Sequence, residues 1–206
     1  MSAVKERTLQ GKIQNIEAGL IKFYPNVNSR KNITSNHTEN MSETSRSKKP
    51  DGFYIFTVIK GNDSHGILVY KETNAENEVN YYLYEPNGIN FINHGFTFNI
   101  RVKPDSELNL RMVPPKSIND QGGDCAIWCI ILIILWNSFE GDDRWIALDI
   151  FHKKMLSISE VRKTFIQRVS NLVNKPRVDY DVPEQVRDFV HEVRHMLNEL
   201  PIVLPN

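Results

Sequence analysis

Residues 121–136 read QGGDCAIWCIILIILW, a glycine-containing turn that leads directly into a continuous apolar segment. The apolar part, residues 126–136, is well short of the roughly 20 residues that a helix needs to cross a bilayer. A shorter helix that is apolar on every side belongs in a protein core. We therefore predict a buried helix that begins at Cys125 and ends near Trp136.

Short runs rich in Tyr, Phe, Val and Ile precede this helix and are separated by turn residues, a pattern typical of β-strands. The five expected strands lie at 53–60, 66–71, 80–85, 96–102 and 108–113. Turns such as Lys60-Gly61-Asn62-Asp63 suit an antiparallel meander.

Helical periodicity returns after the apolar segment. Apolar residues three or four apart predict helices near 144–156, 158–174 and 183–199. A block of strands followed by helices is typical of an α+β fold rather than of alternating βαβ units. We predict a central, mostly antiparallel sheet of about five strands that packs against the helix starting at Cys125, with further C-terminal helices.

The N-terminal part of the chain has a different texture. Residues 1–24 place Ile13, Ile16 and Leu20 at helical spacing, so we expect a short amphipathic helix there. Residues 25–51 are dominated by Asn, Ser, Thr, Lys and Glu, a composition that predicts a flexible polar linker or insertion. Residues 52–206 are then the main folded domain.

Charge and cysteine content limit the classes of function. The 25 basic and 25 acidic residues cancel, so the overall balance demands neither nucleic acid nor a membrane surface as partner. The first twenty residues lack a secretory signal, so we expect a protein that is not secreted. Two cysteines, Cys125 and Cys129, are too few for a recognisable metal site, and we expect neither metal nor cofactor. They are either two small buried hydrophobes or one reactive thiol beside one packing residue.

Three local features make chemical sense together: Ser64-His65-Gly66 at a strand start, Tyr84-Glu85-Pro86-Asn87-Gly88 after another strand, and the turn before Cys125. Adjacent antiparallel strands would place His65 and Glu85 at the same edge of the sheet. A carboxylate there can accept a hydrogen bond from one imidazole nitrogen and leave the other nitrogen facing a thiol. The first turn of a helix and a neighbouring imidazolium both activate a thiol. This pattern predicts Cys125 as nucleophile, His65 as base and Glu85 as orienting acid.

The turn before the nucleophile suggests an oxyanion site. Gly122 and Gly123 would let the backbone approach a substrate carbonyl, and the amide of Cys125 with the side chain of Gln121 could donate hydrogen bonds to it. Cys129, one helical turn further on, is expected to belong to the core.

The order His65, Glu85, Gln121, Cys125, with a long apolar helix after the last, resembles the clan CE cysteine proteases. The similarity covers residues 53–136 and is strongest to adenain-like maturation proteases, which have a similar aromatic-Glu-Pro-x-Gly segment. SUMO-type proteases share an aspartate before the cysteine, as Asp124 is here. By this resemblance the four residues are the base, the orienting acid, the oxyanion donor and the nucleophile, and 52–206 is a cysteine protease domain.

Three positions depart from the family pattern. Gly66 stands where an aromatic residue usually follows the histidine, and Ala126 stands where a glycine commonly follows the cysteine. The family glutamine lies six or seven residues before the cysteine, whereas Gln121 lies four before it. Asn119, six before, is therefore an alternative oxyanion donor.

The resemblance implies an endopeptidase that processes viral capsid or core precursors at small-residue sites such as Gly-Gly or Gly-Ala. It would act in the virion and in the cytoplasm or virus factory of an infected cell, and the Asn-, Lys- and Ile-rich composition suits a large DNA virus or a virophage. Adenain-like enzymes can be stimulated by DNA and by a viral peptide, so either is a candidate activator; no membrane partner is expected. The alternatives are a protease of ubiquitin-like modifiers, an acetyltransferase like the YopJ effectors, and a binding module whose site has decayed.

Overall fold

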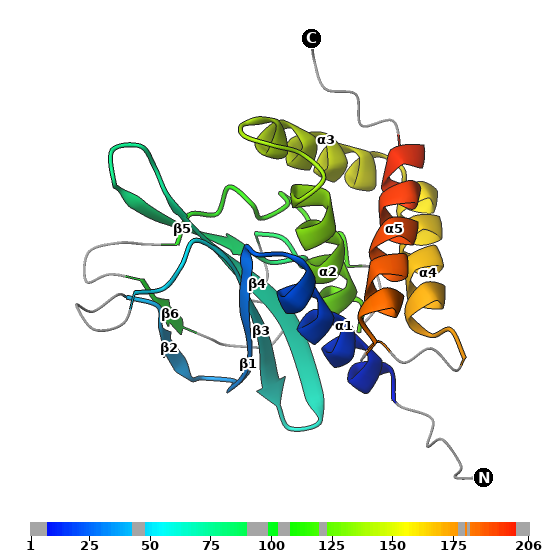
Figure 1. Cartoon of the computed structure of the whole chain (residues 1–206), viewed down its shortest axis with the longest axis horizontal. Helices are drawn as coiled ribbons and strands as arrows, with labels where there is room; N and C mark the ends of the chain where they lie inside the picture. Colours follow the sequence, from blue (N-terminus) through cyan, green and yellow to red (C-terminus); the bar gives the residue numbers. More distant parts are fainter. Residues whose placement is uncertain are drawn as a thin grey trace. The chain divides into compact units, whose positions relative to one another are not determined.

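The computed structural model describes residues 8–42, 48–89, 99–102, 108–119, 123–176, 180 and 182–200. The chain divides into two compact units, and Figure 1 labels the elements of both. One unit, the sheet unit, is Asn26–Cys129, and the other, the helical unit, joins the residues up to Pro25 to Ile130–Asn206. The helix α2, Cys125–Trp136, starts in the sheet unit and ends in the helical unit.

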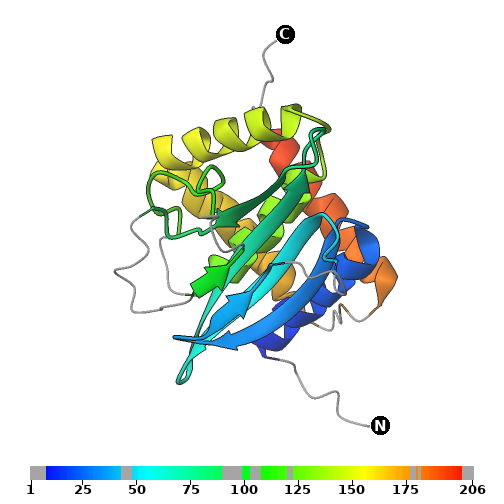
Figure 2. The same cartoon turned by 90° about the vertical axis from the view of Figure 1, so that its left-hand side faces the viewer.

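The sheet unit is built on a mixed four-stranded sheet (Figure 2). The strands in spatial order are β1 (Val27–Thr34), β3 (Gly52–Lys60), β4 (Asp63–Thr73) and β5 (Val79–Tyr84). β1 runs parallel to β3, whereas the β3–β4 and β4–β5 pairs are antiparallel. Two short strands, β2 (Thr38–Asn40) and β6 (Asn99–Arg101), pair in parallel as a second sheet.

Strand β3 is apolar at nearly every position because both of its faces are covered. Every residue from Gly52 to Val58 is buried. Tyr54, Phe56 and Val58 lie in one core cluster with Ile67 and other residues of the neighbouring strands. Alternation of side chains along a strand sends the intervening residues, Phe53 and Ile55, to the opposite face, where they are also buried.

The predicted α+β fold is confirmed, and the strands at 53–60, 66–71 and 80–85 are present within a residue or a few of their expected bounds. The strand expected at 96–102 corresponds to Asn99–Arg101, and its first residues lie outside the described part. The one expected at 108–113 is wrong. Asn109 makes a single bridge to Tyr82, and its side-chain oxygen then accepts the Arg111 N–H at 2.8 Å, which turns the backbone away.

The described residues of 25–51, expected as a flexible linker, instead supply strands β1 and β2. β1 is an edge strand, so the side chains of Lys31 and Asn32 stay exposed while Val27 and Ile33 are buried. Polar and charged residues are common on such edges because they discourage pairing with other chains. A composition suited to a solvated edge therefore resembled that of a disordered segment.

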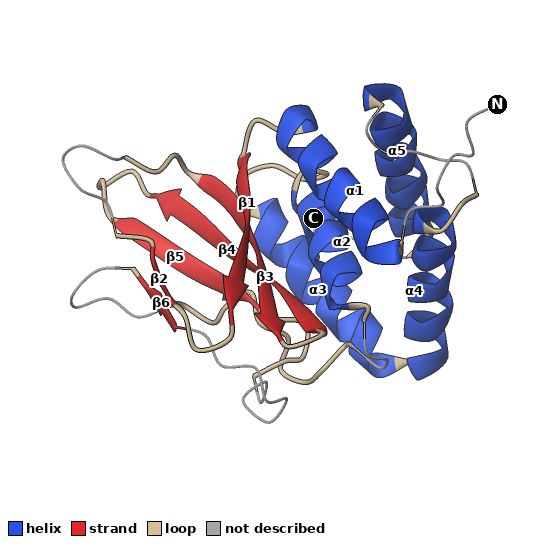
Figure 3. Cartoon of the chain, turned by 90° about the horizontal axis from the view of Figure 1, so that it is seen from below, coloured by secondary structure: helices blue, strands red, loops and turns tan. Residues whose placement is uncertain are grey.

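The helical unit contains α1 (Leu9–Phe23), α3 (Asp143–Ser157), α4 (Ser159–Val173), α5 (Pro183–Glu199) and the end of α2 (Figure 3). These helices match the predicted ranges closely, and α1 packs against α4 and α5. Gly19 permits the close approach of α1 to α5, since an added Cβ would lie 2.4 Å from Cγ2 of Val186. Every residue of α2 from Ile127 to Trp136 is buried. Within the described residues, none of the helices has the length and apolarity needed to span a membrane.

Candidate active site

The register of β4 against β5 brings His65 and Glu85 together. In this antiparallel pair Leu68 lies opposite Tyr84, so one further step of the ladder would place Glu85 opposite Ile67. His65 and Ile67 share a face of β4, which makes His65 and Glu85 diagonal neighbours on that face. Nε2 of His65 lies 2.8 Å from Oε1 and 2.7 Å from Oε2 of Glu85. The predicted contact between these two residues is present.

Glu85 is held by the turn that follows it. Its side chain is fully buried, and Oε1 also accepts the backbone N–H of Asn87 at 2.9 Å. The turn closes with a hydrogen bond from the Gly88 N–H to the Glu85 carbonyl at 3.0 Å. Gly88 has a φ of 77°, and an added Cβ would lie 2.6 Å from the Lys116 carbonyl carbon, so only glycine fits. The carboxylate therefore has a fixed position and two hydrogen-bond donors.

Cys125 lies at the first position of α2, where the predicted helix was expected to begin. The helical hydrogen bonds start with the Trp128 N–H and the Asp124 carbonyl, 2.9 Å apart. The Sγ of Cys125 accepts the backbone N–H of Gly66 at 3.2 Å. A helix start carries partial positive charge, so the backbone on both sides of this sulfur favours a negative charge on it.

Gly66 is needed because the backbone of β4 touches the first turn of α2. A Cβ on this residue would lie 2.8 Å from Cα and 3.2 Å from Cβ of Ala126. Two of the three departures from the clan CE pattern, glycine after the histidine and alanine after the cysteine, therefore occur at residues in direct contact. A larger side chain at 66 would push Cys125 away from His65.

His65 also contacts the thiol. Burial alone would lower the pKa of His65, but hydrogen bonds to Cys125 and Glu85, together with the negative charges of both, raise it to about 10. Nε2 is the ring nitrogen that faces Glu85. His65 is thus a cation at neutral pH, which puts a positive charge and a hydrogen-bond donor beside the sulfur.

Of the two candidate oxyanion donors, Gln121 and Asn119, the structure describes Asn119. Gln121 and Gly122 lie outside the described residues. Asn119 is described, and its Nδ2 donates a hydrogen bond to Oδ1 of Asn87 at 2.9 Å. This contact was missed by the sequence analysis, because nothing in the spacing of two asparagines 32 positions apart indicates that they meet.

Cys129, one turn of α2 beyond the candidate nucleophile, is a buried core residue, as expected. The described residues contain no group of three or more His, Cys, Asp or Glu side chains that could hold a metal ion.

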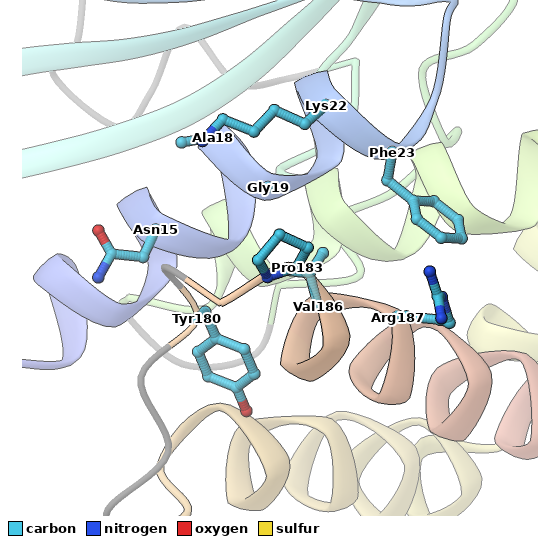
Figure 4. Close-up of a pocket in the computed structure, with 9 residues that line it drawn as sticks. All are labelled: Asn15, Ala18, Gly19, Lys22, Phe23, Tyr180, Pro183, Val186 and Arg187. Atoms are coloured by element: carbon cyan, nitrogen blue, oxygen red, sulfur yellow. The ribbon is translucent and has the colours of Figure 1, made fainter.

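A cavity of about 310 Å³ lies in the helical unit between α1 and α5 (Figure 4). Its wall includes Lys22, Phe23, Val186 and Arg187. Tyr180 also lines it, and the hydroxyl of this residue donates a hydrogen bond to the Leu172 carbonyl at 2.5 Å. The described residues that line it include no cysteine, histidine or carboxylate, so it offers no nucleophile with a base.

No protein-family model matches the chain, and a search of curated proteins also gives no match. The class of protein is therefore inferred from the geometry of the site together with the sequence resemblance.

Proposed function

We propose that the protein is a cysteine endopeptidase in which Cys125 is the nucleophile, His65 the acid–base group and Glu85 the residue that orients His65. The observation that carries the proposal is that three buried groups meet: His65 is hydrogen-bonded to Glu85, and the sulfur of Cys125 accepts the N–H of Gly66, the residue after His65. These groups come from three elements far apart in sequence. A nucleophile, a base and a residue that orients the base are the combination that activates a thiol for acyl transfer.

The geometry supports the following reaction. The Cys125 thiolate attacks the carbonyl carbon of the scissile peptide, and the carbonyl π electrons move to oxygen. When the C–N bond breaks, His65 donates its proton to the departing amine, which leaves a thioester on Cys125. His65, now neutral, takes a proton from a water molecule whose oxygen attacks the thioester carbon. The S–C bond then breaks, the carboxylic acid product leaves, and the thiolate and imidazolium are restored.

The sequence resemblance supports protein substrates cleaved beside small residues, with viral structural precursors as the first candidates. A protease of ubiquitin-like modifiers would use the same three residues and differ in substrate. An acetyltransferase would also form a thioester on Cys125 but would transfer the acyl group to a protein hydroxyl or amine rather than to water.

The test is cleavage of a panel containing Gly-Gly and Gly-Ala peptides and ubiquitin-like fusions by wild type, Cys125→Ala and Cys129→Ala. Cys129 is the matched control, because it is a buried cysteine in the same helix. We expect cleavage by wild type and Cys129→Ala and none by Cys125→Ala. Equal cleavage by all three proteins would contradict the proposal, as would transfer from acetyl-CoA by a wild type that cuts nothing.

A further inference from the structure

A short segment packs against the turn that holds Glu85; we call residues 116–119 the strap. The Ile118 N–H donates to the Pro86 carbonyl at 3.0 Å, and the strap backbone lies so close to Gly88 that a Cβ there would clash with it. At the end of the strap, Nδ2 of Asn119 donates to Oδ1 of Asn87 at 2.9 Å. The strap thus contacts the turn through backbone and side chain.

Asn119 is itself held in place by its neighbour in the strap. The hydroxyl of Ser117 accepts the Asn119 N–H at 3.1 Å and donates to the Asn119 carbonyl at 3.1 Å. This local ring fixes the backbone from which the amide side chain extends, so its direction toward Asn87 is set before any substrate binds.

The contacts form a continuous chain to the base. Asn119 holds the side chain of Asn87, the backbone N–H of Asn87 donates to Oε1 of Glu85 at 2.9 Å, and the Glu85 carboxylate contacts Nε2 of His65. Each link lies within the sheet unit. A change at Asn119 can therefore affect His65 through Asn87 and Glu85, without a direct contact between Asn119 and His65.

We propose that Asn119 is a positioning residue, which fixes Asn87 and through it the carboxylate of Glu85 against His65, and not the oxyanion donor that its spacing from Cys125 suggests. The inference rests on the proposed function, because it assigns Asn119 a part in the same reaction. In the resting protein one of the two N–H groups of its amide already donates to Asn87, so the amide is held by the turn before any substrate binds.

The two roles differ in what they do before substrate arrives. A resting enzyme contains no oxyanion, so loss of an oxyanion donor lowers kcat and leaves the resting site unchanged. Loss of a positioning residue loosens Glu85 and so lowers the pKa of His65 in the free protein. The titration of His65 therefore separates the two roles without any turnover.

The experiment follows the His65 ring by NMR over pH in wild type, Asn119→Ala, Asn87→Ala and the double variant. Asn87→Ala keeps the backbone N–H on Glu85 and removes only the link to Asn119. Asn28→Ala is the matched control, since its side chain also donates to two backbone carbonyls of the same unit, those of Pro50 and Asp51 at 3.3 and 3.0 Å, away from the site.

We expect each single variant to lower the His65 pKa by roughly half a unit, as loss of one hydrogen bond in a relay predicts, and kcat for peptide cleavage by about threefold. The double variant should match either single one, because both break the same link. Asn28→Ala should titrate as wild type. An unchanged His65 titration in a folded Asn119→Ala with reduced kcat, or additive effects in the double variant, would overturn the inference. An ordinary titration of His65 in wild type with no cleavage would instead count against the proposed function itself.

Discussion

At the scale of single residues, the imidazole of His65 has two different partners. Nε2 faces a fully buried carboxylate, and the Cys125 thiol also acts on the pKa of the ring. Burial opposes charge on the ring, yet the two partners outweigh burial and raise the pKa of His65 to about 10. The charge on His65 is thus a property of the pair of partners rather than of the histidine.

Removing those partners should lower the pKa of His65 stepwise. Glu85→Gln keeps a hydrogen-bond acceptor but loses the negative charge, and Cys125→Ala removes the larger of the two hydrogen-bond contributions. We expect each single variant to lower the pKa by about one unit or more, and the double variant to bring it below the ordinary value of 6.5, because burial is then unopposed. Histidine NMR over pH is the measurement. A His65 pKa that stays near 10 in the double variant would show that other groups hold the charge.

The close contact at Gly66 gives a second residue-scale prediction. In Gly66→Ala the new Cβ would lie 2.8 Å from Cα of Ala126, so the strand and the helix start must separate. We expect a loss of about 1–3 kcal/mol in the free energy of unfolding and at least a tenfold slower alkylation of Cys125 by iodoacetamide. Denaturant unfolding and peptide-resolved mass spectrometry measure the two effects.

Gly61→Ala is the control for that variant, because Gly61 sits in the turn joining β3 to β4 with open space around it. Its φ of 59° makes alanine costly there as well, so both variants should be less stable than wild type. Only Gly66→Ala should slow the alkylation of Cys125. Equal alkylation in the two variants would mean that the contact of Gly66 with Ala126 does not position the thiol.

The three candidate catalytic residues were accessible to sequence reasoning, whereas the residues around them were not. His65, Glu85 and Cys125 each mark the start or end of an expected element, so the expected strands and helix, together with the resemblance to clan CE proteases, were enough to group them. Asn119 and Asn87 lie in irregular segments, where no periodicity indicates which side chains meet. Such contacts depend on the path of a loop, and that path follows from packing of the whole unit.

At the scale of elements, the strand β1 differs most from the expectation. Apolar periodicity predicted the helices and the central strands, because those elements bury one or both faces. β1 buries Val27 and Ile33 and exposes most of the residues between them, which leaves little apolar signal. Its order comes from the parallel ladder with β3, from Val27 opposite Phe53 to Thr34 opposite Ile59. Backbone hydrogen bonds with a distant partner have no signature in local composition.

If β1 is an integral strand, the buried residue Ile33 near its end should matter for stability. Ile33 is 3% exposed and belongs to the sheet core, while Thr34 beside it is exposed. Ile33→Ala should lower the free energy of unfolding by about 2–4 kcal/mol, and Thr34→Ala by less than about 1 kcal/mol. Urea unfolding followed by circular dichroism compares the two. Equal, small effects would favour the linker that the composition of 25–51 suggested.

At the scale of the whole molecule, each unit contains a buried histidine, and the two have opposite titration behaviour. His65 in the sheet unit is raised in pKa by its partners, while burial lowers the pKa of His152 in the helical unit to about 4. Both are 5% exposed, so the difference is not one of burial but of neighbours. A buried histidine beside a carboxylate and a thiol stays charged, and one whose shift comes from burial alone stays neutral.

The neutral state of His152 makes the stability of the molecule depend on pH on the acid side. Between the ordinary value of 6.5 and the folded value of about 4, the unfolded chain binds a proton at this position that the folded protein does not. The contribution of His152 to the free energy of unfolding is therefore fully present above pH 6.5 and is lost as pH falls from 6.5 toward 4. The loss is about 2 kcal/mol at pH 5. His152→Phe removes the titrating group, so its free energy of unfolding should fall by about 2 kcal/mol less than that of wild type over the same interval. His191→Phe is the control, because it replaces a histidine at an exposed position, and its slope should match that of wild type. Denaturant unfolding at several pH values measures the three slopes, and the same slope for wild type and His152→Phe would mean that His152 accepts its proton without unfolding.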